Sequence, residues 1–126
     1  MISKVAIWMG LFEDKEKFQQ YTEIEYTKDG DSIDSEFEKD FMLKYYDRDL
    51  VEKDFSNKTT DLDLLLEGFS YSDSFQKENL NIEKEYNSVI LIYDLENITD
   101  IATLTQDKKM DFIGQITYEK IVEDKW

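Results

Sequence analysis

Two stretches of the chain are apolar at nearly every position, which predicts strands covered on both faces. Residues 5–12 read VAIWMGLF and residues 87–95 read NSVILIYDL. Continuous apolar runs of this length are typical of central strands, because a half-exposed strand alternates apolar and polar side chains. Gly10, inside the first run, would let another part of the chain approach closely. Residues 111–119, DFIGQITYE, do alternate and predict a strand with one buried face.

Apolar residues at helical spacing follow the first of these runs. Phe18 and Tyr21 lie three positions apart among charged and amide side chains, and Asp14 is placed to cap the first turn. This pattern predicts a short helix that ends between Tyr21 and Ile24. Gly30, between two aspartates, then indicates a turn in a loop.

A second helix is predicted from a capping box. Ser35 and Glu38 have the required spacing, in which each side chain accepts a hydrogen bond from the backbone of the other residue. Phe37 and Phe41 would share one face of this helix. The helix is expected to run to about Lys44.

The leucine-rich segment further along predicts a third helix. Thr60 or Asp61 can cap its first turn, and Gly68 can end it. The side chains expected to be buried are those of Leu62, Leu65 and Leu66.

The remaining segments carry weaker patterns. Ser72 is expected to begin a further helix that continues through Phe75 to about Ile82. Residues 45–55, YYDRDLVEKDF, fit a loop and a short helix. Residues 96–110 stay open between a helical turn and a further strand, on the basis of Ile98, Ile101 and Leu104.

The order of these elements predicts an α+β fold. Residues 1–126 are expected to form one domain, since the length suits one domain and the absence of proline argues against a long linker. A strand, several helices and then two or more strands would make one mainly antiparallel sheet of three or more strands, with the helices packed on it.

The charge of the chain is strongly one-sided and limits its partners. Thirty acidic residues against fifteen basic residues give a net charge of −15. Such a field repels nucleic acid and anionic membranes and attracts cationic proteins. The plain alternative is that the acidity only maintains solubility. The N-terminus lacks a signal-peptide pattern and no apolar run is long enough to span a membrane, so a cytoplasmic protein is expected.

The composition also disfavours an enzyme, a cofactor or a metal centre. The chain has no cysteine and no histidine, which removes thiolate ligands and the commonest general base. A calcium loop beginning at Asp29 would need glycine at its sixth position, whereas Gly30 is at the second. An irregular, weak divalent site stays open. Ser74 and Lys77 have the Ser-x-x-Lys spacing without its companion motifs, and we expect them on a helix surface.

Acidic residues instead concentrate where a protein partner could bind. Residues 13–54 hold fifteen acidic and seven basic residues, and half of residues 29–40 are carboxylates. Tyrosines lie within and after this run, and tyrosine suits the centre of an interface. Tyr21 better fits the core, while Tyr45 and Tyr46 fit core and interface equally. The candidate partner-binding residues are Asp29, Asp31, Asp34, Glu36, Glu38, Asp40, Tyr45, Tyr46, Asp47 and Asp49.

Several short motifs, in order, resemble the immunity protein 22 family of bacterial polymorphic toxin systems. These are WMGLF (8–12), DSEF (34–37), YYDRD (45–49), LLEGFSYSDSF (65–75), NSVILIYDLE (87–96) and FIG (112–114). The resemblance implies a protein that neutralises a toxin domain and supplies no catalytic residues.

Charge and resemblance together lead to a specific hypothesis. A carboxylate-rich face would occlude a basic active site, such as that of a nuclease toxin. One alternative is an acidic DNA mimic or regulatory protein that occupies an unrelated nucleic-acid-binding partner. Another is a small carboxylate-based hydrolase that uses a divalent ion.

Overall fold

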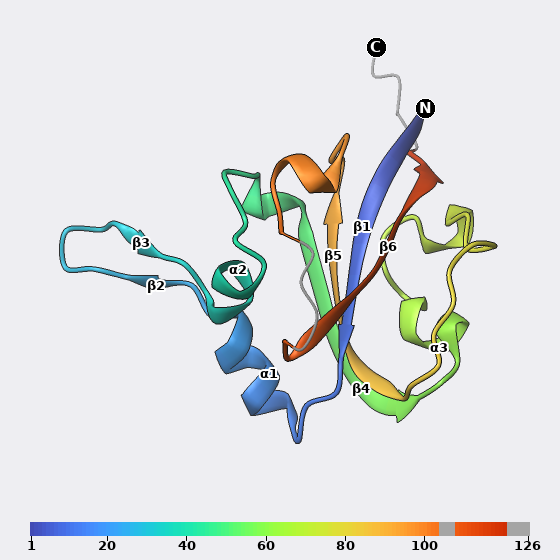
Figure 1. The fold of residues 1–126 in the computed structure, drawn as a ribbon, viewed down its shortest axis with the longest axis horizontal. Helices are drawn as coiled ribbons and strands as arrows, with labels where there is room; N and C mark the ends of the chain where they lie inside the picture. Colours follow the sequence, from blue (N-terminus) through green and yellow to red (C-terminus); the bar gives the residue numbers. More distant parts are fainter. Residues whose placement is uncertain (104–107, 121–126) are drawn as a thin grey trace, which may run out of the picture.

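The computed structural model describes residues 1–103 and 108–120, and its centre is a four-stranded antiparallel sheet (Figure 1). The strands are β1 (Ile2–Gly10), β4 (Val51–Thr59), β5 (Tyr86–Tyr93) and β6 (Met110–Glu119). Their order across the sheet is β4-β5-β1-β6, and every neighbouring pair is antiparallel. The predicted α+β fold with a mainly antiparallel sheet is confirmed.

The two apolar runs form the two inner strands. β5 is buried along its whole length, and β1 is buried from Val5 to Gly10. Alternate side chains of these strands enter two separate clusters: Ala6 and Trp8 lie in one, and Ile7 and Met9 in the other. The prediction of strands covered on both faces is therefore confirmed.

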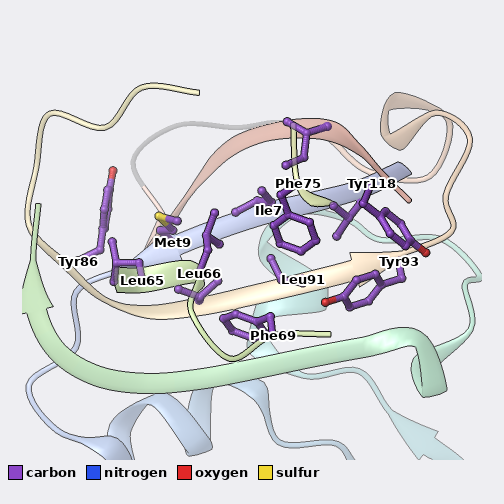
Figure 2. Packing of buried hydrophobic residues seen from close by; sticks show 13 residues of the cluster. Ile7, Met9, Leu65, Leu66, Phe69, Phe75, Tyr86, Leu91, Tyr93 and Tyr118 are labelled. Carbon is purple, nitrogen blue, oxygen red and sulfur yellow. The ribbon is translucent and has the colours of Figure 1, made fainter. Parts of the chain in front are cut away.

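Helices cover the two faces of the sheet unequally (Figure 1). α1 (Lys15–Thr22) and α2 (Glu36–Asp40) contribute to the cluster around Trp8. α3 (Leu62–Leu66) contributes to the other cluster, and Figure 2 shows Leu65 and Leu66 gathered with Phe69 and Phe75 against the sheet. A small hairpin of β2 (Glu25–Tyr26) and β3 (Ser32–Ile33) extends from the body between α1 and α2.

The starts predicted for the first three helices are confirmed by their caps. Asp14 accepts a hydrogen bond from the Lys17 amide at 2.8 Å, and Asp61 caps α3. Ser35 and Glu38 form both hydrogen bonds of the capping box. Gly68, with φ of +86°, follows α3 as expected, and Gly30 lies in the turn between β2 and β3.

The second helix is shorter than predicted, since it ends at Asp40 and not near Lys44. Met42 has a left-handed backbone, with φ of +49°, which breaks the helical path. The Lys44 amide then donates to the Ile101 carbonyl at 2.7 Å, so this segment is bound to a distant loop instead of to its own helix.

The expectation of a loop and a short helix over residues 45–55 holds as far as Leu50 and is wrong for residues 51–55, which form a strand. A short 3-10 turn, η1 (Arg48–Leu50), is present, but it leads directly into β4. β4 is an edge strand with a largely exposed, charged sequence, VEKDFSNKT. The conformation of β4 is determined by its pairing with β5, and its sequence lacks the apolar–polar alternation that would have predicted a strand.

The predicted helix over residues 72–82 is also wrong. Only a 3-10 turn, η2 (Ser72–Ser74), forms there. The chain then leaves helical geometry, and the Gln76 amide donates to the Thr117 carbonyl of β6 at 3.0 Å. Leu80 and Ile82 pack against the sheet from this irregular segment. Their spacing of two residues suits an extended chain better than a helix.

The C-terminal strand is not one-sided as predicted. The register between β1 and β6 shifts between Ile7 and Trp8. Ile7 pairs with Gly114, whereas Trp8 pairs with Phe112. Ile113 is therefore an extra residue, as in a β-bulge, and side chains on either side of it face opposite clusters. Before this strand, Ile98–Asp100 form the 3-10 turn η3, while the predicted Leu104 lies outside the described residues.

The close approach predicted at Gly10 is confirmed and should be sensitive to substitution. A Cβ there would lie 2.9 Å from both the Lys109 carbonyl oxygen and the Met110 Cγ. We expect Gly10→Ala to lower the free energy of unfolding by about 1–3 kcal/mol, as overpacking against backbone does. Urea unfolding would measure it. Gly114→Ala is the control, because only the movable end of Leu80 lies close there, and an equal loss in both variants would contradict the explanation.

Candidate functional site

Six of the ten predicted binding residues surround one groove of about 470 Å³, here called the acidic groove. Its walls come from β3 and the residue after it, from α2 and from the segment that connects α2 to β4. The groove is lined by Ser32, Asp34, Glu38, Leu43, Lys44, Tyr45, Tyr46, Asp47, Arg48 and Asp49. Residues that are close in sequence thus form one continuous surface.

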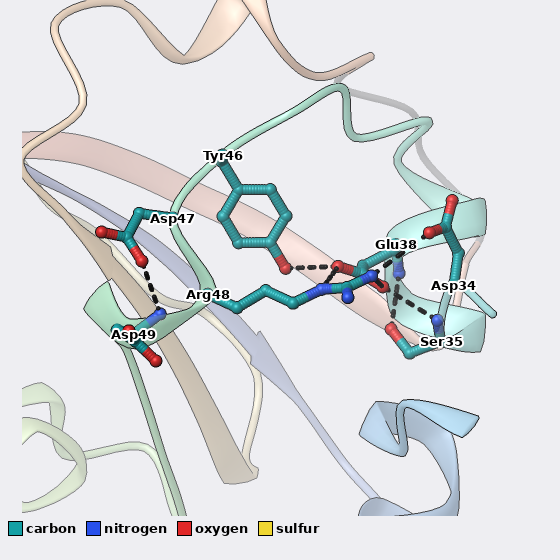
Figure 3. A network of polar contacts seen from close by, with 7 residues as sticks. All are labelled: Asp34, Ser35, Glu38, Tyr46, Asp47, Arg48 and Asp49. Carbon is teal, nitrogen blue, oxygen red and sulfur yellow. Dashed lines mark hydrogen bonds and ion pairs between the residues drawn. The ribbon is translucent and has the colours of Figure 1, made fainter. Parts of the chain in front are cut away.

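A buried carboxylate holds the two sides of this groove together (Figure 3). Glu38 is only 3% exposed, yet it accepts hydrogen bonds from three directions. The Tyr46 hydroxyl donates at 2.6 Å, and Arg48 donates through Nε at 2.9 Å and Nη2 at 3.0 Å. The Ser35 amide completes the set at 2.9 Å. Because these donors come from α2 and from the connecting segment, Glu38 fixes one against the other.

The same contacts shift the pKa values of the three side chains in this cluster, which are Glu38, Tyr46 and Arg48. Burial by itself would raise the pKa of Glu38, but the hydrogen bonds from Arg48, Tyr46 and the Ser35 backbone outweigh it and lower the pKa. Burial and the neighbouring carboxylate raise the pKa of Tyr46. The hydrogen bond to Glu38 raises the pKa of Arg48. The cluster therefore holds a carboxylate, a phenol and a guanidinium at neutral pH.

Other groups around the groove face solvent. Asp34, Asp47 and Asp49 are exposed, and Tyr45 is 96% exposed. Asp34 lies 3.3 Å from the Arg48 guanidinium, and Asp47 accepts a hydrogen bond from the Asp49 amide at 2.9 Å. These contacts orient the carboxylates and still leave them accessible. The groove therefore presents acidic groups beside an exposed aromatic ring.

The other predicted residues lie elsewhere. Asp29 and Asp31 are exposed and lie in the turn between β2 and β3. Glu36 forms an ion pair with Lys109 at 2.7 Å, and Asp40 accepts a hydrogen bond from Tyr21 at 2.8 Å. Tyr21 itself is 2% exposed, in agreement with the core interpretation, and Tyr46 is half-buried.

Arg48 is the residue that sequence reasoning missed. The predicted set includes the aspartates on both sides of it and passes over the cation between them. One signal was available, because Arg48 is the only arginine in the sequence. Arginine suits a bidentate contact to a carboxylate, so a single arginine within YYDRD indicated a buried acidic partner.

The residues of the catalytic and metal-binding alternatives can also be placed in the structure. The Ser74 hydroxyl donates to the Tyr71 carbonyl at 2.8 Å, and Lys77 pairs with Asp63 at 2.6 Å, so the serine and the lysine have separate partners. They do not share a helix surface as expected. Within residues 1–103 and 108–120, no group of three or more acidic residues is arranged to hold a metal ion. The described helices include none that is long and apolar enough to cross a membrane.

Comparison with models of protein families gives a match over most of the chain. A family model described as Immunity protein 22 matches residues 5–119, a range that includes all but the first three residues of the central sheet and every residue of the acidic groove. No curated protein and no solved structure matches the chain.

Glu38→Gln tests the role of the buried carboxylate. The folded-state pKa of Glu38 is lowered, so its ionised form stabilises the protein above the ordinary pKa of 4.5, and this contribution is lost as the pH falls below that value. We expect the variant to lose about 1–3 kcal/mol of unfolding free energy at pH 7. The difference from the unmodified protein should shrink in acid.

Urea unfolding at a series of pH values would measure this difference. Glu78→Gln is the control, since Glu78 is exposed and makes no ion pair within the described part of the chain. A loss that is the same at pH 3 and pH 7 would show that the carboxylate charge contributes nothing.

Proposed function

Because the chain belongs to the immunity protein 22 family, we propose that it binds a cognate bacterial toxin domain and blocks its basic active site with the acidic groove. Proteins of this family neutralise toxins and are generally not enzymes. The proposal adds the surface, the chemistry of the target and the location, which is the cytoplasm of the cell that makes the toxin or of its kin. Neutralisation would be stoichiometric, with no reaction catalysed.

The proposal rests on a set of accessible carboxylates whose backbone is held in place by buried contacts. Asp34, Asp47 and Asp49 face solvent around one groove, and the Glu38–Arg48 contacts hold the backbone beneath them. A preorganised acidic surface binds a cationic site with less loss of conformational entropy. It also accelerates encounter, since opposite charges steer the two proteins together.

The exposed tyrosine supplies the apolar part of such an interface. Tyr45 is 96% exposed beside the groove, and Met42, nearby in sequence, is 66% exposed. Large exposed side chains beside charged groups are typical of contacts that contribute much of the binding free energy. A nuclease is the favoured class of toxin, because a cleft that holds phosphates must present lysine and arginine. Asp29 and Asp31, on the hairpin, would extend the contact beyond the groove.

Capture from the native host tests the function directly. The tagged protein, washed at moderate salt, is expected to retain the toxin domain of one large secreted protein at near one-to-one stoichiometry. Mass spectrometry would identify it, and co-expression with the captured domain would test protection. Recovery of many unrelated basic proteins, all released by salt, would instead indicate an acidic mimic of nucleic acid and contradict a dedicated antidote.

Removing the accessible charges of the groove should slow association. For Asp34→Asn/Asp47→Asn/Asp49→Asn, we expect the association rate constant with the captured toxin to fall about tenfold or more at low salt. The difference should shrink at high salt, where screening is strong. Surface plasmon resonance at several salt concentrations would measure this.

The matched control for that variant removes the same number of charges from another face. Asp73→Asn/Glu78→Gln/Glu83→Gln changes exposed residues of the segments near α3. Equal slowing by both triple variants would mean that net charge matters and that the groove does not.

A further inference from the structure

The outer edge of β4 is an open sheet edge. β4 pairs with β5 on one side, and no other strand of the described chain pairs with it. Lys53 and Asp54, in the middle of its regular pairing, are exposed. Such an edge presents a row of backbone donors and acceptors to whatever lies beside it.

A hollow lies against each face of this edge. The first, of about 210 Å³, lies between β4 and the layer of α1 and α2; its apolar walls are Ile24, Phe37, Val51 and Ile90. The second, of about 440 Å³, lies between β4 and residues 67–70 on the other face. Successive side chains of a strand point to opposite faces. A strand added to β4 would therefore place alternate side chains into the two hollows.

The two hollows favour different side chains. In the second, Asp54 and Glu67 are exposed, and neither forms an ion pair within the described part of the chain. The third carboxylate of this hollow, that of Glu52, already accepts hydrogen bonds from the Ser70 amide at 2.9 Å and from the Tyr93 hydroxyl at 3.1 Å. The second hollow thus suits a lysine or arginine, whereas the first suits an apolar side chain.

The first hollow adjoins the acidic groove, since Tyr46 and Arg48 line both of them. A partner seated in the groove would therefore lie close to the start of β4. Of the charges at the rim of the first hollow, Arg48 is neutralised by Glu38, and Lys53 donates to the Thr22 hydroxyl at 2.7 Å. Arg48 therefore does not repel a cationic partner at full strength, whereas Lys53 keeps its charge and favours an uncharged side chain in the first hollow.

We propose that the outer edge of β4 receives an extended segment of the toxin by strand addition, with an apolar side chain in the first hollow and a lysine or arginine in the second. This inference rests on the proposed function and deepens it. Backbone hydrogen bonds along β4 would provide affinity, and the two hollows would provide specificity. The recognised sequence would alternate apolar and basic residues.

A second copy of the chain is the less suitable occupant. Two copies would bring together two net charges of −15, whereas a basic segment is attracted. The charged residues of β4 also oppose indiscriminate pairing of its edge, as is common for exposed edge strands. Charge complementarity therefore favours the basic, extended segment.

The test uses the full chain labelled with ¹⁵N and a capped octapeptide of alternating lysine and valine. NMR titration is expected to shift the backbone amides of residues 51–55 and their neighbours in β5. The same peptide N-methylated at every second residue keeps its charges and side chains but loses the donors of one edge. We expect it to bind about tenfold more weakly, consistent with the loss of a few backbone hydrogen bonds.

A pair of protein variants tests the second hollow. Asp54→Asn/Glu67→Gln should weaken binding of the lysine–valine peptide several-fold, whereas Asp73→Asn/Glu78→Gln, which removes as many charges elsewhere, should not. An alternating glutamate–valine peptide should bind neither form. Shifts confined to residues 27–49, or equal affinity for the N-methylated peptide, would overturn the inference.

Two further outcomes separate this inference from the proposed function. If the free protein sediments as a dimer and Lys53→Glu makes it monomeric, the edge belongs to a second copy and the inference is wrong. If one toxin is captured and neutralised while amide shifts in its complex spare residues 51–55, the function stands and only strand addition fails. Failure to capture any toxin removes the function whatever the peptide does.

Discussion

The two inner strands of the sheet are apolar on both faces, and this constraint determines the rest of the architecture. Trp8 on β1 is fully buried among Phe37, Phe41 and Phe112, whereas its neighbour Ile7 faces the opposite cluster. Each face therefore needs its own cover. The chain between β1 and β5 supplies it: α1 and α2 cover one face before β4, and α3 with the following segment covers the other. β4 lies where the chain crosses between these layers, which leaves it at the edge.

A second constraint operates at the boundary of the α1–α2 layer. Glu38 lies within a five-residue helix, where a buried charge has little regular structure to support it. Tyr46 and Arg48 supply the missing partners. A buried carboxylate without such donors would lower the stability of the fold by several kcal/mol. The segment between α2 and β4 therefore packs back against α2, where Tyr46 and Arg48 reach Glu38, before β4 begins. The acidic groove is the space that this return encloses.

The sequence predicted the elements whose conformation depends on neighbouring residues, and it failed for the element whose conformation depends on distant ones. Continuous apolar runs and side-chain caps announce β1, β5 and the starts of three helices, because these depend on neighbouring residues. β4 is charged and exposed, so only its pairing with β5 defines it. In the groove, the proximity of Tyr45, Asp47 and Asp49 follows from sequence. The contact of Arg48 with Glu38 joins residues ten positions apart without periodicity, so the single arginine indicates an acidic partner but does not identify Glu38.

The separation between the residues that hold the groove and those that face solvent bears on how such a protein can evolve. Tyr45, Asp47 and Asp49 contribute few internal contacts, so their replacement would cost the fold little. Glu38 and Arg48 keep the backbone in place beneath them. Under the proposed function, these solvent-facing residues could change in step with changes on the surface of the toxin, while the frame beneath them stays the same. Loops on a rigid scaffold permit this kind of diversification in other binding proteins.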